Sequence, residues 1–400
     1  YGEGTTAMTI SRHYVLAAGG TGGHLIPAFA LGQELINRGH NVALITDARG
    51  AKIPGCPDKV ATHLLPAGRI TKKPSSWLPG IQAIAQGRKM ARGLYENFEP
   101  SAVVGFGGYP AFPALLGAFA EKIPTIIHEQ NAVLGRVNRF TARHVNAIAT
   151  SYPEVLRLSP RYAGKVHLVG NPIREEVLAL RDKPYPPLLD ADIFRVLVTG
   201  GSQGATVLSD VVPDGLSQLP LNLRRRLQVT QQCRAEDIEA VRAAYVAHGI
   251  PAELATYLPD LPERLGWAHM VISRAGASTI AELTCAGRPA ILVPLPSATD
   301  DHQSYNVKEM VQAGGARAIA QPAFTAVELA KQIEKIALEP GALENAAKAA
   351  KNCGRPNAVA DLADLVESFG RAPIMHHITS PSEHRGAFSS SPALAKENVA

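Results

Sequence analysis

Three junctions in the sequence combine glycines with polar side chains where an apolar run passes into a helical pattern. They are Gly19-Gly20-Thr21-Gly22-Gly23-His24, Gly105-Phe106-Gly107-Gly108-Tyr109-Pro110 and Gly200-Gly201-Ser202-Gln203-Gly204-Ala205. Glycine allows positive φ and a close approach of ligand to backbone, and a following helix N-terminus favours an anion. Any one junction could be a structural tight turn. Three in one chain predict contact with a phosphate or sugar ligand at two or more of them.

A fourth junction runs from Ser273 to Glu282 and carries hydroxyl and carboxylate groups instead of repeated glycines. Backbone N–H groups and the helix dipole at this position can hold a diphosphate. Glu282 lies four residues beyond Ser278, on the same helical face, where its carboxylate can accept from a ribose diol. The alternative is that Ser278 and Thr279 only cap the helix and that Glu282 is a solvated charge.

Two histidines are candidates for acid–base chemistry. His24 follows a glycine loop, and an imidazole titrates near neutral pH, although a histidine there can also be a hydrogen-bonding turn residue. The string His128-Glu129-Gln130-Asn131 ends another apolar run and offers further polar groups at the same edge. Asp300-Asp301-His302-Gln303 suggests metal ligation, but adjacent side chains seldom converge on one ion, so substrate hydrogen bonding is the preferred interpretation.

The first glycine loop also imitates a dinucleotide-binding fingerprint, with Asp47 ending the next apolar run. The spacing argues against that interpretation, because after Gly20 and Gly22 the third glycine would fall at Leu25. An NAD-dependent oxidoreductase therefore stays only as an alternative.

These side chains need a scaffold, and apolar runs alternating with helical patterns predict parallel sheets covered on both faces. The expected strands form two series, which predicts an α/β fold with two doubly wound domains. The first series is 13–18, 41–46, 101–105, 125–128 and 146–150, and the second is 194–199, 226–230, 270–273, 290–293 and 316–319.

A domain boundary is expected near residue 170, because Gly170-Asn171-Pro172 and the proline-rich stretch 183–187 favour extended backbone. The expected domains are 8–170 and 171–354. Residues 371–400 have no periodicity and are expected to form a disordered tail without a catalytic role. Met8 is the expected natural start, which would leave residues 1–7 outside the fold.

The composition of the chain limits the kinds of partner that it can bind. The chain is 46% hydrophobic and has 40 basic against 35 acidic residues, with no basic block of the kind that binds nucleic acid. Four scattered cysteines predict neither a disulfide framework nor a zinc site and fit a reducing cytoplasm. The segment 69–92 mixes basic residues with Trp77, Leu78 and Ile81, which suits an anionic leaflet or an ordinary solvated surface. No apolar run is long enough to span a bilayer.

Taken together, these motifs resemble the MurG family of peptidoglycan N-acetylglucosaminyltransferases, which convert lipid I to lipid II. The resemblance is specific in combination and order, with the matching strings between about residues 13 and 313 and the similarity extending to 370. The matching strings are residues 18–24, 105–109, 128–131, 170–174, 200–205, 274–279 and 301–303. One departure is Gln231-Gln232-Cys233-Arg234, where the family commonly has His-Gln followed by a small residue and glycine, so a donor-site role for that loop is in doubt.

The resemblance implies a GT-B architecture, in which two Rossmann-like domains face each other across a cleft and a C-terminal helix at 355–370 returns to the first domain. It implies that the second domain binds UDP-GlcNAc, with Leu258 meeting uracil through its backbone, Glu282 the ribose and Gln303 the sugar. The first domain would meet the acceptor and the membrane. The implied donor-site residues are Thr21, Gly22, Gly23, Asn131, Arg174, Ser202, Leu258, Ala277, Ser278, Thr279, Ile280, Ala281, Glu282 and Gln303.

The implied reaction is an inverting attack of the muramyl C4 hydroxyl on the anomeric carbon of an α-linked donor, with His24 as leading base and His128 and Glu129 as substitutes. It requires no cofactor and no metal. The implied location is the cytoplasmic face of the bacterial inner membrane, held peripherally. The alternatives are a UDP-GlcNAc 2-epimerase or another GT-B transferase, and a non-catalytic sugar-nucleotide sensor.

Overall fold

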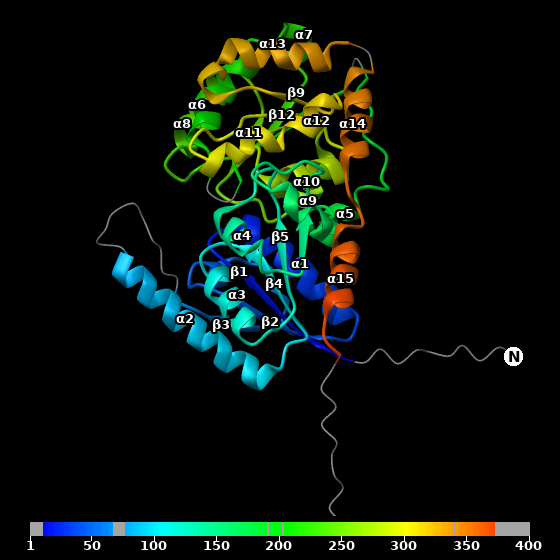
Figure 1. The fold of residues 1–400 in the computed structure, drawn as a ribbon. Coiled ribbons are helices and arrows are strands. Elements are labelled where there is room, and N and C mark those ends of the chain that lie inside the picture. The colour runs from blue at the N-terminus through cyan, green and yellow to red at the C-terminus, as the bar shows by residue number, and fades with distance from the viewer. Residues whose placement is uncertain (1–10, 67–76, 190–191, 202–203, 340, 373–400) are drawn as a thin grey trace, which may run out of the picture.

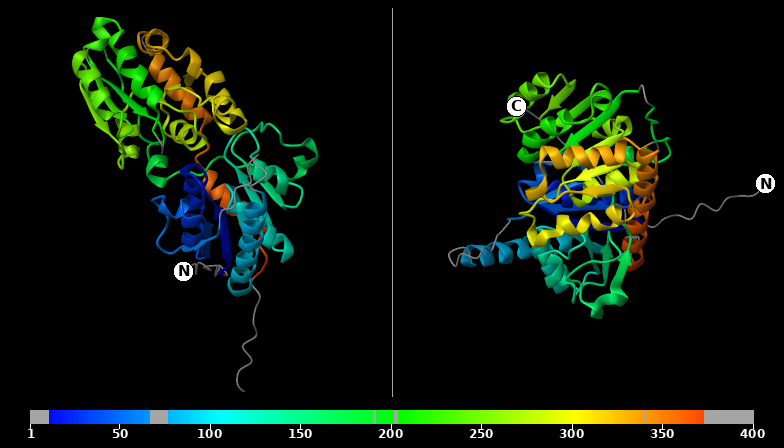
Figure 2. Two further views of the ribbon diagram at one scale, coloured as in Figure 1. Left: turned by 90° about the vertical axis from the view of Figure 1, so that its left-hand side faces the viewer. Right: turned by 90° about the horizontal axis from the view of Figure 1, so that it is seen from above.

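The computed structural model describes residues 11–66, 77–189, 192–201, 204–339 and 341–372. The chain forms two α/β lobes, one above the other in Figure 1 and seen from two further sides in Figure 2. A seven-stranded sheet organises the first lobe and a six-stranded sheet the second. All of their paired strands are parallel. The prediction of two doubly wound parallel-sheet domains is therefore confirmed.

The first sheet has the order β3-β2-β1-β4-β5-β6-β7. Its central strands are buried over their whole length, with apolar clusters on both faces, as expected where helices cover each side. The strands are β1 (His13–Ala18), β2 (Asn41–Thr46), β3 (Ala61–Leu64), β4 (Ala102–Gly107), β5 (Thr125–Glu129), β6 (Ala147–Thr150) and β7 (Val166–Leu168).

The helices around this sheet include one long outer helix, α2, which stands apart at the lower left of Figure 1. Helix α1 begins at Gly22, earlier than expected, so the last two glycines of the first loop and Pro27 all lie inside it. The helices are α1 (Gly22–Asn37), α2 (Trp77–Phe98), α3 (Ala111–Ala120) and α4 (Arg136–Thr141).

The second sheet repeats the topology in the order β10-β9-β8-β11-β12-β13. Its strands are β8 (Phe194–Thr199), β9 (Leu227–Gln232), β10 (Ala252–Ala255), β11 (Met270–Ser273), β12 (Ala290–Leu292) and β13 (Ala316–Ala318). The helices from the linker onwards are α5 (Glu175–Leu178), α6 (Thr206–Ser217), α7 (Leu221–Arg224), α8 (Ile238–Ala247), α9 (Leu261–Trp267), α10 (Ala277–Ala286), α11 (His302–Asn306), α12 (Lys308–Gln312), α13 (Ala326–Ala337) and α14 (Ala342–Cys353).

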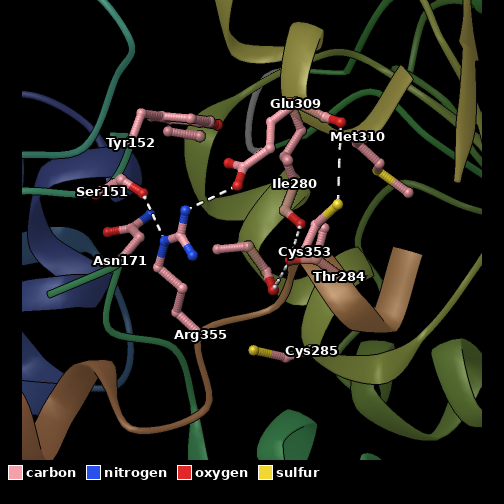
Figure 3. Close-up of a pocket in the computed structure, with 12 residues that line it drawn as sticks. Ser151, Tyr152, Asn171, Ile280, Thr284, Cys285, Glu309, Met310, Cys353 and Arg355 are labelled. Carbon is pink, nitrogen blue, oxygen red and sulfur yellow. Dashed lines mark hydrogen bonds and ion pairs between the residues drawn. The ribbon is translucent and has the colours of Figure 1, made fainter. Parts of the chain in front are cut away.

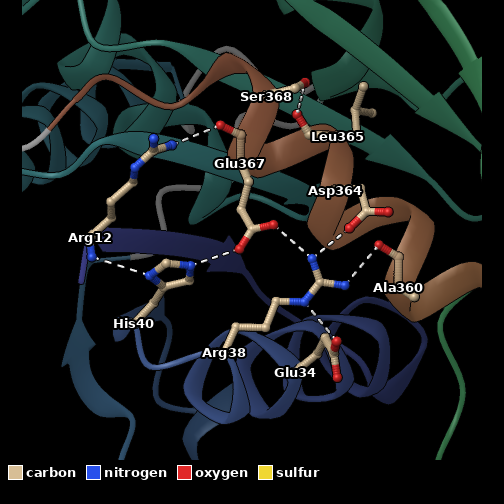
Figure 4. Close-up of polar contacts among 9 residues, drawn as sticks. All are labelled: Arg12, Glu34, Arg38, His40, Ala360, Asp364, Leu365, Glu367 and Ser368. Carbon is tan, nitrogen blue, oxygen red and sulfur yellow. Dashed lines mark hydrogen bonds and ion pairs between the residues drawn. The ribbon is translucent and has the colours of Figure 1, made fainter. Parts of the chain in front are cut away.

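The chain returns to the first lobe through α15 (Ala358–Phe369), which packs against α1. Polar contacts fix this return, as Figure 4 shows. Arg38 of α1 donates to Asp364 at 2.5 Å and to Glu367 at 2.7 Å, and the buried His40 meets the other oxygen of Glu367 at 2.7 Å. The expected return of a C-terminal helix is therefore observed.

Three strands were missing from the sequence prediction: β3, β7 and β10. None of them has a fully buried residue, so none shows a continuous apolar run. All three lie at the edge of a sheet beside the strand that precedes them in sequence. Tertiary pairing with a buried neighbour, and not the local pattern, makes these residues strands.

Candidate active site

The cleft residues lie where each sheet reverses its strand order. That reversal falls between β1 and β4 in the first sheet and between β8 and β11 in the second. Ligands of open parallel sheets bind beyond the carboxyl ends of the strands at such a point. The four junctions recognised in the sequence follow these four strands, so the topology brings them together in two pairs.

The two glycine loops of the first domain pack against each other. A Cβ added to Gly19 would lie 2.5 Å from Pro110, and one added to Gly108, whose φ is +82°, would lie 2.5 Å from the Gly19 carbonyl oxygen. Close packing and positive φ therefore account for these two glycines without a ligand. The tight-turn interpretation holds for part of both loops.

His24 lies in the first turn of α1, beside the second glycine loop. Its Nδ1 is 3.0 Å from the Gly19 carbonyl oxygen, which can only accept, so Nδ1 carries the hydrogen and Nε2 keeps its lone pair. A Cβ on Gly107 would lie 3.1 Å from that Nε2. Burial lowers the pKa of His24, which keeps the imidazole neutral and able to take a proton near pH 7.

His128 is fully buried and has both ring nitrogens engaged. Nε2 donates to the Gly170 carbonyl oxygen at 2.9 Å, and Nδ1 accepts from the Gln130 amide at 3.0 Å. Burial lowers its pKa to about 4. The prediction that His128 can substitute as base does not fit this geometry, because its only acceptor nitrogen is already occupied.

Glu129 is also buried, and its two oxygens accept hydrogen bonds from the surrounding loop. The backbone N–H groups of Asn131 and Gly135 donate at 3.0 and 2.8 Å, and the Asn138 amide donates at 2.9 Å. Burial raises the pKa of Glu129, and these donors oppose that rise. The carboxylate shapes the loop after β5, so a role as substitute base does not fit here either.

In the second domain, α10 begins directly beyond β11 with Gly276 as its N-cap. No side chain caps this helix, and the Ser278 hydroxyl has no hydrogen-bond partner among the described residues. Ser278 and Thr279 are half-buried. The capping alternative for these two residues is therefore wrong, and the first turn of α10 keeps N–H and O–H groups available for an anion.

Glu282 is 6% exposed, so the solvated-charge alternative is wrong. Arg174 of the linker donates to one carboxylate oxygen, Oε1, from Nε at 3.0 Å and from Nη2 at 2.8 Å. Burial raises the pKa of Glu282, and the Arg174 charge opposes that rise. The sequence placed both residues in the donor site, and the structure brings them into direct contact beside α10.

Gln303 of α11 organises the loops around α10. Its Oε1 accepts from the backbone N–H groups of Ala275 at 3.1 Å and Leu295 at 2.9 Å. The side-chain oxygen is thus committed within the protein. Leu258 is buried in the apolar cluster beneath α10, which leaves its backbone as the part that can meet a base.

Two polar links across the cleft were not anticipated. Asn306 of α11 bonds to Asn131 and to the Ala132 backbone of the first domain. Asp300 pairs with Arg139 at 2.8 Å and with Arg157 at 2.6 Å. Neither Asn306 nor the two arginines belong to a recognisable motif, so only the tertiary structure identifies them.

A small pocket of about 30 Å³ lies at the hinge, where the chain passes between the domains (Figure 3). Arg355 spans it, donating to the Ser151 carbonyl oxygen at 3.3 Å and to Glu309 at 2.8 Å. Both polar atoms of the buried Asn171 side chain lack partners within the described part of the chain.

Some predicted residues lie outside the described structure. They are Ser202 and Gln203 of the third glycine loop, residues 69–74 of the basic segment, residues 1–7 and the tail from 373. The departure at 231–234 is partly explained, because Gln231 accepts from Tyr245 at 2.6 Å and Gln232 accepts from Thr199 at 2.8 Å. Both glutamines serve the interior of the second domain.

Within the described ranges, no group of three or more His, Cys, Asp or Glu residues is arranged to hold a metal ion. No helix in that part of the chain is long and apolar enough to cross a membrane. The charged groups at the cleft include the Arg174–Glu282 pair and the ion pairs of Asp300 with Arg139 and Arg157.

Two facing parallel-sheet domains, with a helix N-terminus and an arginine–glutamate pair in the cleft, offer a site for an anionic ligand beyond the ends of the strands. Residues 14–150 match the glycosyltransferase family 28 N-terminal domain, and residues 195–366 match its C-terminal domain. The chain belongs to glycosyltransferase family 28. This confirms that it is a glycosyltransferase of GT-B architecture and removes the oxidoreductase alternative.

Particular relatives narrow the class. A protein from Novosphingobium aromaticivorans named UDP-N-acetylglucosamine--N-acetylmuramyl-(pentapeptide) pyrophosphoryl-undecaprenol N-acetylglucosamine transferase is 68% identical over 92% of this chain and 95% of its own. One of the same name from Erythrobacter litoralis is 65% identical over 91% and 92%. The crystal structure of Acinetobacter baumannii MurG matches with a TM-score of 0.70 and 27% identity, covering 89% of this chain and 99% of that one. The resemblance inferred from the motifs is confirmed.

Proposed function

We propose that this chain transfers GlcNAc from UDP-GlcNAc to undecaprenyl-pyrophosphoryl-MurNAc-pentapeptide (lipid I), giving lipid II and UDP in peptidoglycan synthesis. The observation that carries the proposal is the 68% identity, over 92% of this chain, to a relative named for this transfer. The site geometry supports it independently, because an anion site and a buried carboxylate lie together in the cleft.

The proposal assigns the acceptor and the membrane to residues 8–170 together with the returning helix 355–370, and UDP-GlcNAc to residues 171–354. In the second domain, Leu258 would hold uracil through its backbone and Glu282 the ribose diol. That role is supported by Arg174 binding Oε1, which leaves Oε2 without a hydrogen bond from the residues that the structure describes. The other donor contacts would be Thr21, Gly22, Gly23, Asn131, Arg174, Ser202, Gln303 and residues 277–281.

The reaction we infer is a direct, inverting displacement. The muramyl C4 oxygen forms a bond to the anomeric carbon while the bond from that carbon to the diphosphate oxygen breaks, and the electron pair leaves with UDP. The hydroxyl proton passes to His24 Nε2, whose lone pair is available because Nδ1 is the nitrogen that donates to Gly19.

The leaving diphosphate needs positive charge as it departs. Arg174 and the N–H groups at the start of α10 supply it in this proposal, without a metal ion. Glu282 holds the Arg174 guanidinium beside that helix.

We further propose peripheral attachment to the cytoplasmic face of the inner membrane through α2. Trp77, Leu78 and Ile81 are each more than half exposed in its first turns, and the basic side chains of Arg88, Lys89 and Arg92 follow. Apolar side chains beside cations suit an anionic leaflet.

The test is a UDP-release assay with labelled UDP-GlcNAc and a short-chain lipid I analogue, run with and without EDTA. We expect lipid II and UDP in equal amounts in both arms. UDP-GlcNAc binding without UDP release would indicate a sensor, and ManNAc formation without acceptor would indicate a 2-epimerase. Strict sensitivity to EDTA would overturn the metal-free mechanism, and vesicle sedimentation with and without anionic lipid tests the attachment.

A further inference from the structure

Asn306, at the end of α11, is fully buried although it has a polar side chain. Its Oδ1 accepts from the Ala132 backbone N–H at 2.8 Å. Its Nδ2 donates to the Asn131 Oδ1 at 3.0 Å and to the Ala275 carbonyl oxygen at 3.2 Å. Both amide hydrogens are therefore used, one in each domain.

These bonds determine which way the Asn131 amide points. Asn131 donates through Nδ2 to Glu129 at 3.4 Å and accepts through Oδ1 from Asn306, so a flipped amide would set donor against donor and acceptor against acceptor. A chain of hydrogen bonds thus runs from the buried Glu129 carboxylate through Asn131 and Asn306 to the loop before α10.

The same α11 helix also fixes that loop from its other side. Ala275, two residues before α10, has its N–H bound by Gln303 and its carbonyl oxygen bound by Asn306. The position of the α10 N-terminus therefore depends on contacts that α11 makes, and one of those contacts reaches the first domain.

The segment 299–306, which includes α11, also contains residues in a strained, left-handed backbone conformation. Asp300 and Asp301 have φ of 57° and 55°, and Arg157, which pairs with Asp300, has φ of 63°. Left-handed conformations of residues other than glycine persist where surrounding contacts enforce them. The interdomain ion pairs supply such contacts, so this segment is built around the meeting of the two domains.

We infer that Asn306 is a positioning residue that completes the donor site only when the two domains meet. It orients Asn131 from the first domain and holds the loop before α10 in the second. The inference rests on the proposed function, in which Asn131 and α10 contact the nucleotide sugar. Through Asn306, binding of the nucleotide sugar and contact between the two domains are energetically coupled.

A double-mutant cycle on the full chain tests this coupling. The variants are Asn306→Ala, Asn131→Ala and their combination, with Asn306→Asp as an isosteric variant that keeps an acceptor for Ala132 but loses the two donated bonds. The measurements are the Kd for UDP-GlcNAc by calorimetry, kcat and KM with a lipid I analogue, and the melting temperature.

We expect each single variant to lower kcat/KM for UDP-GlcNAc on the order of tenfold, because buried partners lose their bonds. The double variant should be within about threefold of the worse single variant, since both break one chain. Fully multiplicative losses, or wild-type kinetics for Asn306→Asp, would overturn the inference.

Two controls separate coupling from other effects. Asp300→Asn weakens another interdomain contact without touching Asn131. The fold-loss in kcat/KM that it causes should therefore multiply with the fold-loss caused by Asn131→Ala. Ile333→Ala opens a cavity in α13, at a fully buried position, and should lower the melting temperature with kcat/KM unchanged per folded molecule. If the wild type binds UDP-GlcNAc but transfers nothing, the proposed function fails. The double-mutant cycle can then still test the coupling, from the Kd values for UDP-GlcNAc.

Discussion

Glu129 and Glu282 are both buried carboxylates near the cleft, yet they are bound in opposite ways. The two Glu129 oxygens accept from backbone and asparagine donors of its own domain. Among the described residues, Arg174 is the hydrogen-bond partner of Glu282, and it binds one oxygen. Burial raises the pKa of each, so electrostatics does not separate them. The difference lies in unused hydrogen-bonding capacity, and on that ground we propose Glu282 as a ligand contact and Glu129 as part of the scaffold.

The two histidines of the first domain show the same contrast. His128 uses both ring nitrogens inside the protein, whereas His24 uses Nδ1 and leaves Nε2 available. Residue type is the same in each pair, and both glutamates are buried, whereas His24 is less buried than His128. The bonding partners tell a structural group from one that can act on a substrate, and four variants test this distinction.

The largest effect is expected for His24→Ala. Loss of the general base should lower kcat by about 10²- to 10⁴-fold with a smaller change in the KM for UDP-GlcNAc. Since burial lowers the pKa of His24, the wild-type rate should fall with decreasing pH only below 6.5, as the imidazole becomes protonated. Steady-state pH profiles check both points. His248→Ala, at a surface pair with Asp214, is the control. An unchanged kcat for His24→Ala would remove His24 as base.

The next largest effect is expected for Glu282→Ala, measured as UDP-GlcNAc affinity by calorimetry. Losing a charged acceptor for the ribose should weaken binding on the order of 10- to 100-fold, with a smaller effect on turnover at saturation. Asp214→Asn, which breaks a surface pair in the same domain, should bind normally. A variant with normal affinity and lost turnover would reverse the assignments of Glu282 and His24.

Glu129→Gln should affect stability more than catalysis. The glutamine oxygen can still accept from Asn131, while its NH₂ group would face the donors of Gly135 and Asn138, at a cost of about 1–3 kcal/mol in unfolding free energy. Turnover per folded molecule should change by less than about threefold. Denaturant unfolding and active-site-normalised rates check this. Lost turnover at unchanged stability would instead identify Glu129 as a base.

The last effect, expected from His128→Gln, appears only as a pH dependence of stability. The pKa of His128 is about 4 in the folded chain against an ordinary 6.5, so between these values the unfolded chain binds a proton that the folded chain does not. Stability should therefore fall as pH drops from 6.5 towards 4, by up to about 1.4 kcal/mol per pH unit from this group. His269, whose pKa is also about 4, adds a second such contribution. The free energy of unfolding, measured with urea at a series of pH values, should fall less steeply between pH 6.5 and 4 for His128→Gln than for the wild type. An equal pH dependence would contradict the prediction.

The missed strands and contacts show where sequence reasoning stops. Buried strands such as 13–18 and 194–199 were predicted to the residue, because a continuous apolar run in a parallel sheet is a local signal. Strand β10 has no such run and becomes a strand only by pairing with β9. Asn306 and Arg139 likewise became recognisable only through partners more than 150 residues away.

The sequence by itself determined the α/β class, the two strand series and the motif order that identifies the family, since these depend on local periodicity and on residue types at short spacing. Only the tertiary structure decided which polar residues have hydrogen-bonding capacity left for a ligand. His24 and His128 are the same residue type, as are Glu282 and Glu129, so residue type does not separate the members of either pair. They differ because the fold gives His128 partners at both ring nitrogens and Glu129 partners at both carboxylate oxygens, whereas the partners that the described residues supply to His24 and Glu282 engage one atom of each.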